Sequence, residues 1–201
     1  MSSVHLFVLF WLVLAGQTSG TLLSDMVSTL NKHIEVIKGP SEFRKLPAKL
    51  DGFKFINCGN KTDLGEISNI AISPDPLRKK ANVSFSFEAF VKADVIGKPI
   101  ALNSTLEAFL DDQWRLLPCY GYIGSCMFDN ICDIISEFDC PQVLLKQGIH
   151  CKCPYYHGRY YLPTTDFYLE DGFYPTSYRI RLELSHNALR VACAQVSFVF
   201  A

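Results

Sequence analysis

The chain has 201 residues, a formal net charge of −1 at pH 7 and a hydrophobic content of 49%. A charge this close to zero, with no cluster of Lys and Arg, argues against a nucleic-acid-binding protein. The length suits one domain that buries a sizeable core.

The first twenty residues are typical of an export signal. Residues 4–15 form the apolar run VHLFVLFWLVLA, and small residues follow up to Gly20. The run is shorter than the roughly 18 residues that a membrane-spanning helix needs, and its position suits a signal peptide. We therefore predict a signal peptide at 1–20, an N-terminal extension at 21–52 and one domain at 53–201. The protein is expected in the secretory pathway, either lysosomal or extracellular.

The extension contains a helical pattern over residues 22–38, which Gly39-Pro40 ends. Three interpretations are open: an amphipathic helix that covers its own domain, a membrane-facing arm, or a processed propeptide. We favour a helix packed on its own domain. The apolar positions of the pattern recur at steps of three and four residues: Leu22, Leu23, Met26, Val27, Leu30, Ile34 and Ile37.

From Phe53 onward the hydrophobic period changes to two. Apolar and polar residues alternate over 82–91, 102–110 and 178–184, which is typical of antiparallel strands with one buried and one solvated face. We predict an all-β fold, an antiparallel β-cup or sandwich of about seven or eight strands. Over about 189–200 apolar residues occupy both faces, which a β-bulge or burial on two sides would explain.

Eight cysteines in an exported chain predict disulfide bonds. Six fall between Cys119 and Cys153, where they would staple loops, and Cys58 and Cys193 remain to tie the two ends of the domain. Spacing alone does not choose among the possible pairings. Cys151 and Cys153 should nevertheless have different partners, because residues two apart on an extended segment point to opposite faces.

Three N-glycosylation sequons begin at Asn60, Asn82 and Asn103. Each predicts a surface position if it is occupied, and we expect one or two of them to be used. Asn82 and Asn103 fall on the polar side of their predicted strands, which agrees with sugars that point outward.

No catalytic motif is present: the chain lacks a G-x-S-x-G elbow, H-E-x-x-H and a Walker loop. We predict a protein that is not an enzyme and has no cofactor. Residues 150–157 hold two histidines and two cysteines. Their C-x-C spacing in an oxidising compartment favours disulfides over a metal site, so we expect no metal.

Aromatic residues are dense in what we expect to be the later loops of the domain. They are candidates for the mouth of a pocket or for an interfacial anchor, and the alternative is ordinary core packing. They are Tyr155, Tyr156, Tyr160, Tyr161, Phe167, Tyr168, Phe173 and Tyr174.

The segment from Cys119 to Cys153 resembles the GM2 ganglioside activator family of lysosomal proteins. The likeness extends over about residues 53–200 and includes all eight cysteines. It rests on LPC at 117–119, YIGSC at 122–126, Phe128, CD at 132–133, CP at 140–141, GIHC at 148–151, CP at 153–154, G-x-Y-x-LP at 158–163, Phe167, YRI at 178–180, NC at 57–58, PDP at 74–76 and NVS at 82–84.

The resemblance implies a β-cup with a large apolar cavity that holds lipid tails and leaves the head group outside. Such a protein would extract a sphingolipid of the ganglioside type, or a phospholipid, during transient contact with a membrane. It would present the lipid to a lysosomal hexosaminidase. The implied disulfides are Cys58–Cys193, Cys119–Cys126, Cys132–Cys153 and Cys140–Cys151. The alternatives are a secreted carrier of another lipid, or a stapled β domain for binding or defence without lipid transfer.

The rim of the family's cup carries two tryptophans that are thought to enter the membrane. Trp114, five residues before Cys119, matches the first. The second position falls near Phe173 and Tyr174, where this chain keeps an apolar anchor without a tryptophan.

The substitution Trp114→Ala is therefore predicted to slow lipid extraction and to leave the fold intact, because it removes an anchor rather than core. Transfer of lipid from vesicles, together with a thermal unfolding curve, checks this expectation. Unchanged transfer rates would count against Trp114 as an anchor.

Overall fold

The computed structural model describes residues 20–38, 52–95, 99–136, 140–169 and 172–201. The predicted signal peptide therefore lies outside the described residues, apart from Gly20. The elements in chain order are α2 (Gly20–Lys38), β1 (Lys54–Asn57), β2 (Gly65–Ser73), β3 (Ala81–Val91), β4 (Ile100–Leu110), β5 (Gln113–Leu116), β6 (Met127–Phe128), α3 (Ile131–Ser136), α4 (Gln142–Lys146), β7 (Gly158–Leu169), β8 (Thr176–His186) and β9 (Leu189–Phe200).

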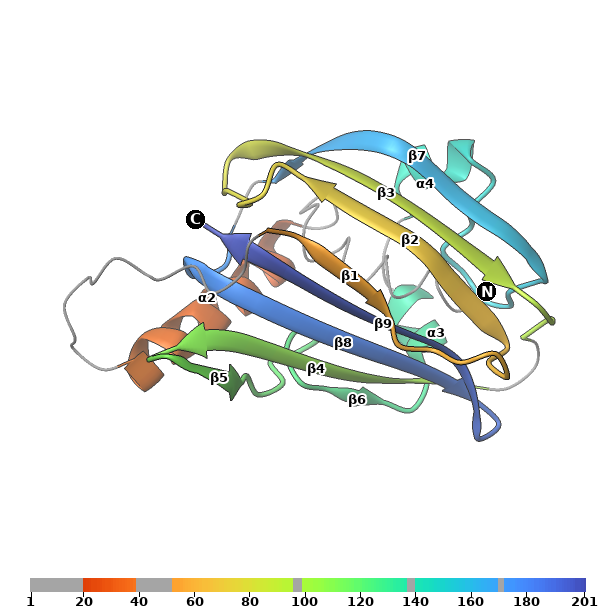
Figure 1. Cartoon of the computed structure of the whole chain (residues 1–201), viewed down its shortest axis with the longest axis horizontal. Coiled ribbons are helices and arrows are strands. Elements are labelled where there is room, and N and C mark those ends of the chain that lie inside the picture. Colours follow the sequence, from red (N-terminus) through yellow and green to blue (C-terminus); the bar gives the residue numbers. More distant parts are fainter. Residues whose placement is uncertain (1–19, 39–51, 96–98, 137–139, 170–171) are drawn as a thin grey trace.

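The strands form two antiparallel sheets that face each other (Figure 1). Sheet A has the order β1-β9-β8-β4-β5, with β6 also paired to β4, and sheet B has the order β2-β3-β7. The all-β antiparallel prediction is confirmed. The described residues contain nine strands rather than seven or eight, because β1, β5 and β6 have only two to four residues each and show no alternation of their own.

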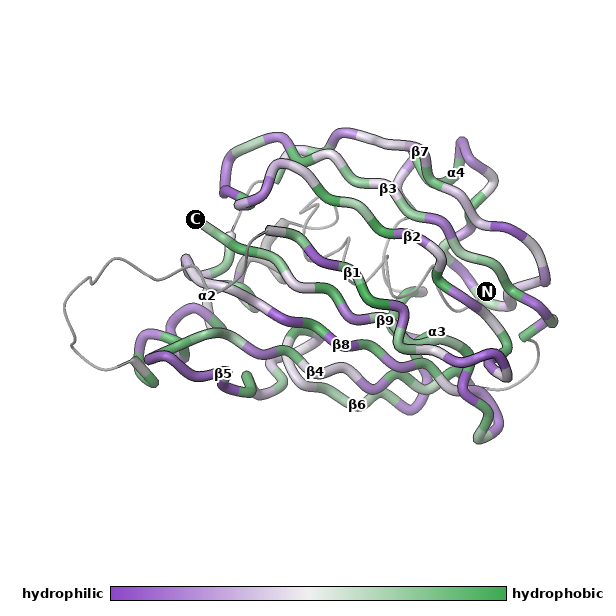
Figure 2. Tube along the Cα trace, viewed as in Figure 1, coloured by the Kyte–Doolittle hydropathy of each residue, from purple (hydrophilic) through white to green (hydrophobic). Residues whose placement is uncertain are grey.

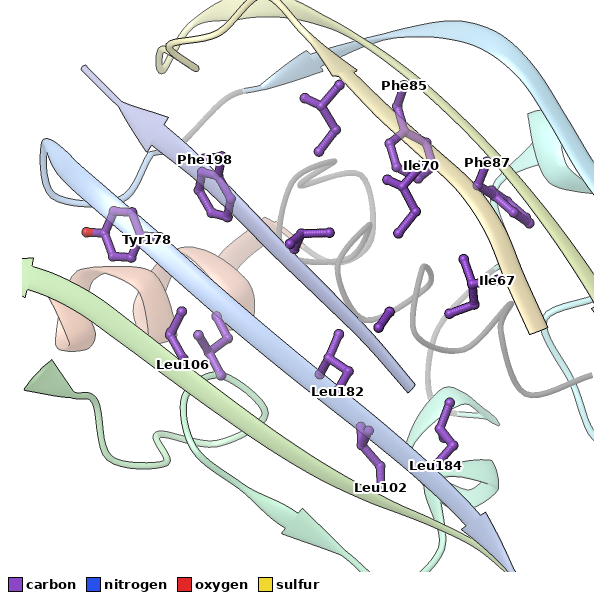
Figure 3. Packing of buried hydrophobic residues seen from close by; sticks show 14 of the residues in the cluster. Ile67, Ile70, Phe85, Phe87, Leu102, Leu106, Tyr178, Leu182, Leu184 and Phe198 are labelled. Atoms are coloured by element: carbon purple, nitrogen blue, oxygen red, sulfur yellow. The ribbon is translucent and has the colours of Figure 1, made fainter. Parts of the chain in front are cut away.

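Figure 2 shows hydrophobic and hydrophilic residues following one another along the long strands. Because neighbouring residues of a strand point to opposite faces, this alternation puts apolar side chains on one face of each sheet. On β3, Phe85 and Phe87 are about 1% exposed. On sheet A, Tyr178 of β8 pairs in register with Phe198 of β9, and their rings stack with centroids 5.6 Å apart. Figure 3 shows such residues of both sheets in one core: Ile67, Ile70, Phe85, Phe87, Leu102, Leu106, Tyr178, Leu182, Leu184 and Phe198.

The last strand, β9, shows both of the features that its sequence suggests, a β-bulge and burial on two sides. The pairing of β8 with β9 shifts register between Leu184 and Ser185, which is a β-bulge. Val191 and Cys193 are also buried, although they point away from the face that carries Ala192 and Ala194. Burial on two sides and a bulge therefore occur together.

Helix α2 packs on its own domain, as we favoured from its sequence. Val27, Leu30 and Ile34 are at most 4% exposed and belong to the same apolar cluster as the facing sheets. The apolar stripe of the helix is thus buried inside the molecule.

Four disulfides join the pairs that the family resemblance implies. Cys58–Cys193 spans a sequence separation of 135 and ties β1 to the middle of β9. The other three span 7, 21 and 11 positions and staple the segment between β5 and β7: Cys119–Cys126, Cys132–Cys153 and Cys140–Cys151.

Replacing Cys58 and Cys193 by Ser should destabilise the protein more than replacing Cys119 and Cys126 by Ser. In the chain-entropy account the long bridge contributes about 5 kcal/mol and the short bridge about 2 kcal/mol. Urea unfolding of the two double variants measures the difference. Equal losses of unfolding free energy would contradict this account.

Candidate functional site

An apolar pocket opens on the inner face of sheet A. Its volume is about 50 Å³, which is well below the roughly 300–1,000 Å³ of ordinary ligand sites. A long ligand would therefore enter only if part of the lining moved. The lining residues are Leu102, Ser104, Leu106, Tyr122, Ile123, Gly124, Phe128, Phe173, Ile180 and Leu182.

One wall of the pocket comes from the two central strands of sheet A. Leu106 of β4 lies opposite Ile180 of β8, and Ser104 lies opposite Leu182. Alternation points these side chains inward, away from the solvated face that carries Glu107. This wall is fixed because β4 and β8 are paired along nine consecutive positions.

The opposite wall is the stapled loop, residues 119–126, which the Cys119–Cys126 disulfide closes. Within it Tyr120 and Ile123 exchange two backbone hydrogen bonds of 2.7 and 3.1 Å. Gly124 has a φ of +117°, and a Cβ there would lie 2.0 Å from the Pro118 carbonyl oxygen. Only glycine fits this position, so the path of the stapled loop depends on it.

The stapled loop is also held to β4 by hydrogen bonds. Ser104 and Cys126 exchange backbone hydrogen bonds of 2.8 and 3.0 Å. The Ser104 hydroxyl donates to the Gly124 carbonyl at 3.0 Å, so this buried polar group in the lining is satisfied. With Tyr122 it supplies the only polar side chains among the lining residues.

The lining contains no carboxylate, imidazole, ammonium or guanidinium group. Such a pocket suits an uncharged apolar chain, because burying a charge without a partner is costly. The two hydroxyl groups of the lining, on Ser104 and Tyr122, therefore have no carboxylate, imidazole or amine beside them in the lining to activate them.

Next to the pocket, burial raises the pKa of the Tyr178 phenol well above its usual value. The phenol therefore stays neutral and donates to the Tyr174 carbonyl at 2.7 Å.

Ion pairs lie away from the pocket. Asp63 is 3% exposed, and its carboxylate accepts hydrogen bonds from the Arg190 guanidinium and the Asn60 backbone N–H, each at 2.9 Å. At the surface, hydrogen bonds from the His157 backbone and side chain hold the pKa of Asp94 below its usual value. These interactions tie loops together and do not face the lining.

Phe173, one of the three rim residues expected from the sequence, lies in the pocket lining and is 5% exposed. Its ring centroid is 5.3 Å from that of Tyr178 and 6.2 Å from that of Phe200. Tyr174, the second expected residue, is partly buried against the same core. Of these two neighbours in the chain, Phe173 lines the pocket and Tyr174 does not.

Trp114, the third expected rim residue, lies elsewhere. It is on β5 opposite Phe109 of β4, and the two ring centroids are 5.4 Å apart. The Arg179 guanidinium covers the Trp114 ring at 4.6 Å, and the same guanidinium bonds Glu107 at 2.6 Å. Trp114 is thus part of the outer face of sheet A and is not in the lining of this pocket.

The expectation that the later aromatics occupy loops is wrong for half of them. Tyr160, Tyr161, Phe167 and Tyr168 lie on β7. Tyr161 and Tyr168 face solvent and are 49% and 46% exposed, whereas Tyr160 and Phe167 pack against the core. Tyr155 is fully buried.

The asparagines of the three sequons, Asn60, Asn82 and Asn103, are all exposed. In the 150–157 segment Cys151 and Cys153 form disulfides with different partners, so neither is a free thiolate. Among the described residues no three His, Cys, Asp or Glu side chains lie close enough to hold a metal ion. Within the same part of the chain no helix has the length and apolar character needed to cross a membrane.

Comparison with known proteins matches residues 52–200 to the ML domain. The ganglioside GM2 activator of Mus musculus is 32% identical over 160 residues, which cover 75% of this chain and 82% of that protein. The ganglioside GM2 activator of Macaca fascicularis is 30% identical over 159 residues, with coverages of 74% and 83%. Among solved structures, a Niemann-Pick type C2 protein from the Japanese carpenter ant matches with 19% identity and a TM-score of 0.40, covering 74% of this chain and 99% of that one.

Proposed function

Because this chain belongs to the ML-domain family, we propose that it binds one lipid at a time and carries it between membranes without changing it chemically. The observation that carries this proposal is the pocket on the inner face of sheet A, whose lining offers apolar walls and no charge. Lipid binding also agrees with the GM2 activators, to which the chain is 30–32% identical.

The chemistry is transfer. Removing a lipid from a bilayer exposes its chains at a cost of about 0.8 kcal/mol for each CH₂ group. Apolar lining side chains such as Leu106, Ile180 and Leu182 offset that cost, because they replace the contacts that the lipid chains made with other lipids. A charged or sugar-bearing head group finds no partner in this lining and stays outside.

We further propose that the lipid is a glycosphingolipid of the ganglioside type and that a lysosomal hexosaminidase receives it. The names and the identity of the two GM2 activators support this choice. A secreted carrier of another lipid is the alternative, and an optimum for transfer near neutral rather than acidic pH would favour it.

The end of the molecule that carries α2 is the proposed face for membrane contact. Asn82 and Asn103 are exposed on the outer faces of sheets B and A, where sugars would hinder a flat approach. Asn60 lies in the loop between β1 and β2, which Figure 1 shows at the opposite end from α2. Phe173 and Tyr174 lie beside α2 and are available to contact lipid if this end opens.

The test of the function is native mass spectrometry of the purified secreted protein, followed by extraction and identification of any lipid. Bound glycolipid or phospholipid supports the proposal. A protein that carries no lipid, and takes up none from vesicles at about pH 5 or pH 7, contradicts it. Adding the loaded protein to purified hexosaminidase then tests the partner, by release of the terminal sugar.

The substitution Ile180→Trp should weaken lipid uptake about tenfold or more. The indole would fill the pocket, and forcing a chain past it carries an overpacking cost of about 1–3 kcal/mol. Uptake of a fluorescent phosphatidylcholine from vesicles measures the effect.

Gln195→Trp is the matched control, because Gln195 faces outward from the neighbouring strand β9 opposite Arg181. It should keep the uptake of the unmodified protein. Equal uptake by both variants would show that the pocket on sheet A does not hold the lipid.

A further inference from the structure

Helix α2 is an addition to the family domain. The ML-domain match begins at residue 52, whereas α2 ends at Lys38. Yet one face of α2 is buried as deeply as the core of the domain, since Leu30 and Ile34 are 0% exposed. The opposite face carries exposed residues such as Lys32 and Glu35. A helix outside the domain has thus become part of its apolar cluster.

The first fixed contact of α2 is with the rim segment, residues 172–174. The Asn31 side-chain Nδ2 donates to the Gly172 carbonyl at 3.0 Å, and the Tyr174 backbone N–H donates to the Asn31 side-chain Oδ1 at 2.7 Å. One side chain therefore satisfies two backbone groups on either side of Phe173. Phe173 itself lines the pocket.

The second fixed contact is with the stapled loop, residues 119–126. The Tyr120 hydroxyl and His33 Nδ1 lie 2.7 Å apart, and their rings meet edge to face at 5.3 Å. Met26 packs so closely over Gly121 that a Cβ there would lie 2.8 Å from the Met26 sulfur. The stapled loop supplies Tyr122, Ile123 and Gly124 to the lining.

Helix α2 therefore holds together the two segments whose separation would enlarge the pocket. We propose that α2 is a lid: it keeps the pocket in its small closed form, and a lipid enters when α2 leaves the rim segment and the stapled loop. This inference rests on the proposed function, since it concerns how that same pocket is filled. Figure 1 shows α2 at the end of the molecule where β4 ends and β8 begins.

A lipid surface is the environment that opens such a lid. In water, release of α2 would expose Val27, Leu30 and Ile34, which is unfavourable. At a bilayer the same apolar face can enter the interface while Lys32 and Glu35 remain in water, as amphipathic helices do. Contact with a membrane thus lowers the cost of opening at the place where the lipid is collected.

The experiment measures uptake of a fluorescent phosphatidylcholine from phosphatidylcholine vesicles by full-length variants. Asn31→Ala removes both contacts with the rim segment and should speed uptake about fivefold or more, the factor expected for one net hydrogen bond. Thr29→Ala is the matched control: its hydroxyl is exposed and bonds only within the helix, to the Asp25 carbonyl. The control should match the unmodified protein.

A second variant locks the lid. With Cys at positions 26 and 121, a disulfide is within reach, because a Cβ at 121 would lie 3.2 Å from Met26 Cγ. The locked protein, its new bridge verified by mass spectrometry, should take up lipid at least about tenfold more slowly than Met26→Cys alone, which keeps Gly121 and cannot form the bridge.

A label on Val36→Cys reports movement of α2, because Val36 is 78% exposed and all eight native cysteines are paired. The label should gain mobility when vesicles are added. Uptake by the locked protein at the rate of Met26→Cys would overturn the lid and leave lipid binding intact. The same holds if Asn31→Ala frees the label without faster uptake. No uptake by any variant would overturn the proposed function, and the lid with it.

Discussion

Sheet A has six strands and sheet B has three, so the inner face of sheet A is wider than the sheet that covers it. Sheet B contacts sheet A along one side, where β2 lies against β1 and β9. On the side of β4 the apolar residues of sheet A need another cover, because apolar surface left in water is unfavourable. The stapled loop, the rim segment and α2 provide it. A wall of this kind is less uniform than a sheet, and the pocket lies beneath it.

The disulfides make this irregular cover possible. Among its described residues, the segment between β5 and β7 holds only short elements: β6, α3 and α4. Such pieces bury too little apolar surface to order themselves, and three staples within the segment limit the conformations they lose on folding. The long bridge from Cys58 to Cys193 acts on the sheet instead and fixes β1, a strand of four residues, against β9. The wall formed by sheet A and the wall formed by the stapled loop are thus stabilised by different disulfides.

The sequence predicted the parts of the fold that repeat a simple period. Strict alternation located β3, β4 and β8, and the three-to-four step located α2. The alternation rule failed for β7. There the adjacent aromatic pairs Tyr160-Tyr161 and Phe167-Tyr168, on either side of Pro163, break the period of two and resemble the composition of a loop. The lining could not be predicted, because Leu106 and Ile180 alternate like any core residue. What makes them face a pocket is that sheet B has too few strands to cover the whole inner face of sheet A. The cysteine pairs required the family resemblance, since spacing alone left them open.

Helix α2 carries no cysteine, so residues 39–51 are its only covalent link to a domain whose four disulfides all begin at or after Cys58. While the chain is whole, α2 stays near its binding surface at an effective concentration on the order of millimolar. A single cut between 39 and 51 would leave every bridge intact and turn α2 into a separate peptide. Its retention would then depend on its affinity and on dilution, so one proteolytic event would make closure of the pocket a bimolecular equilibrium.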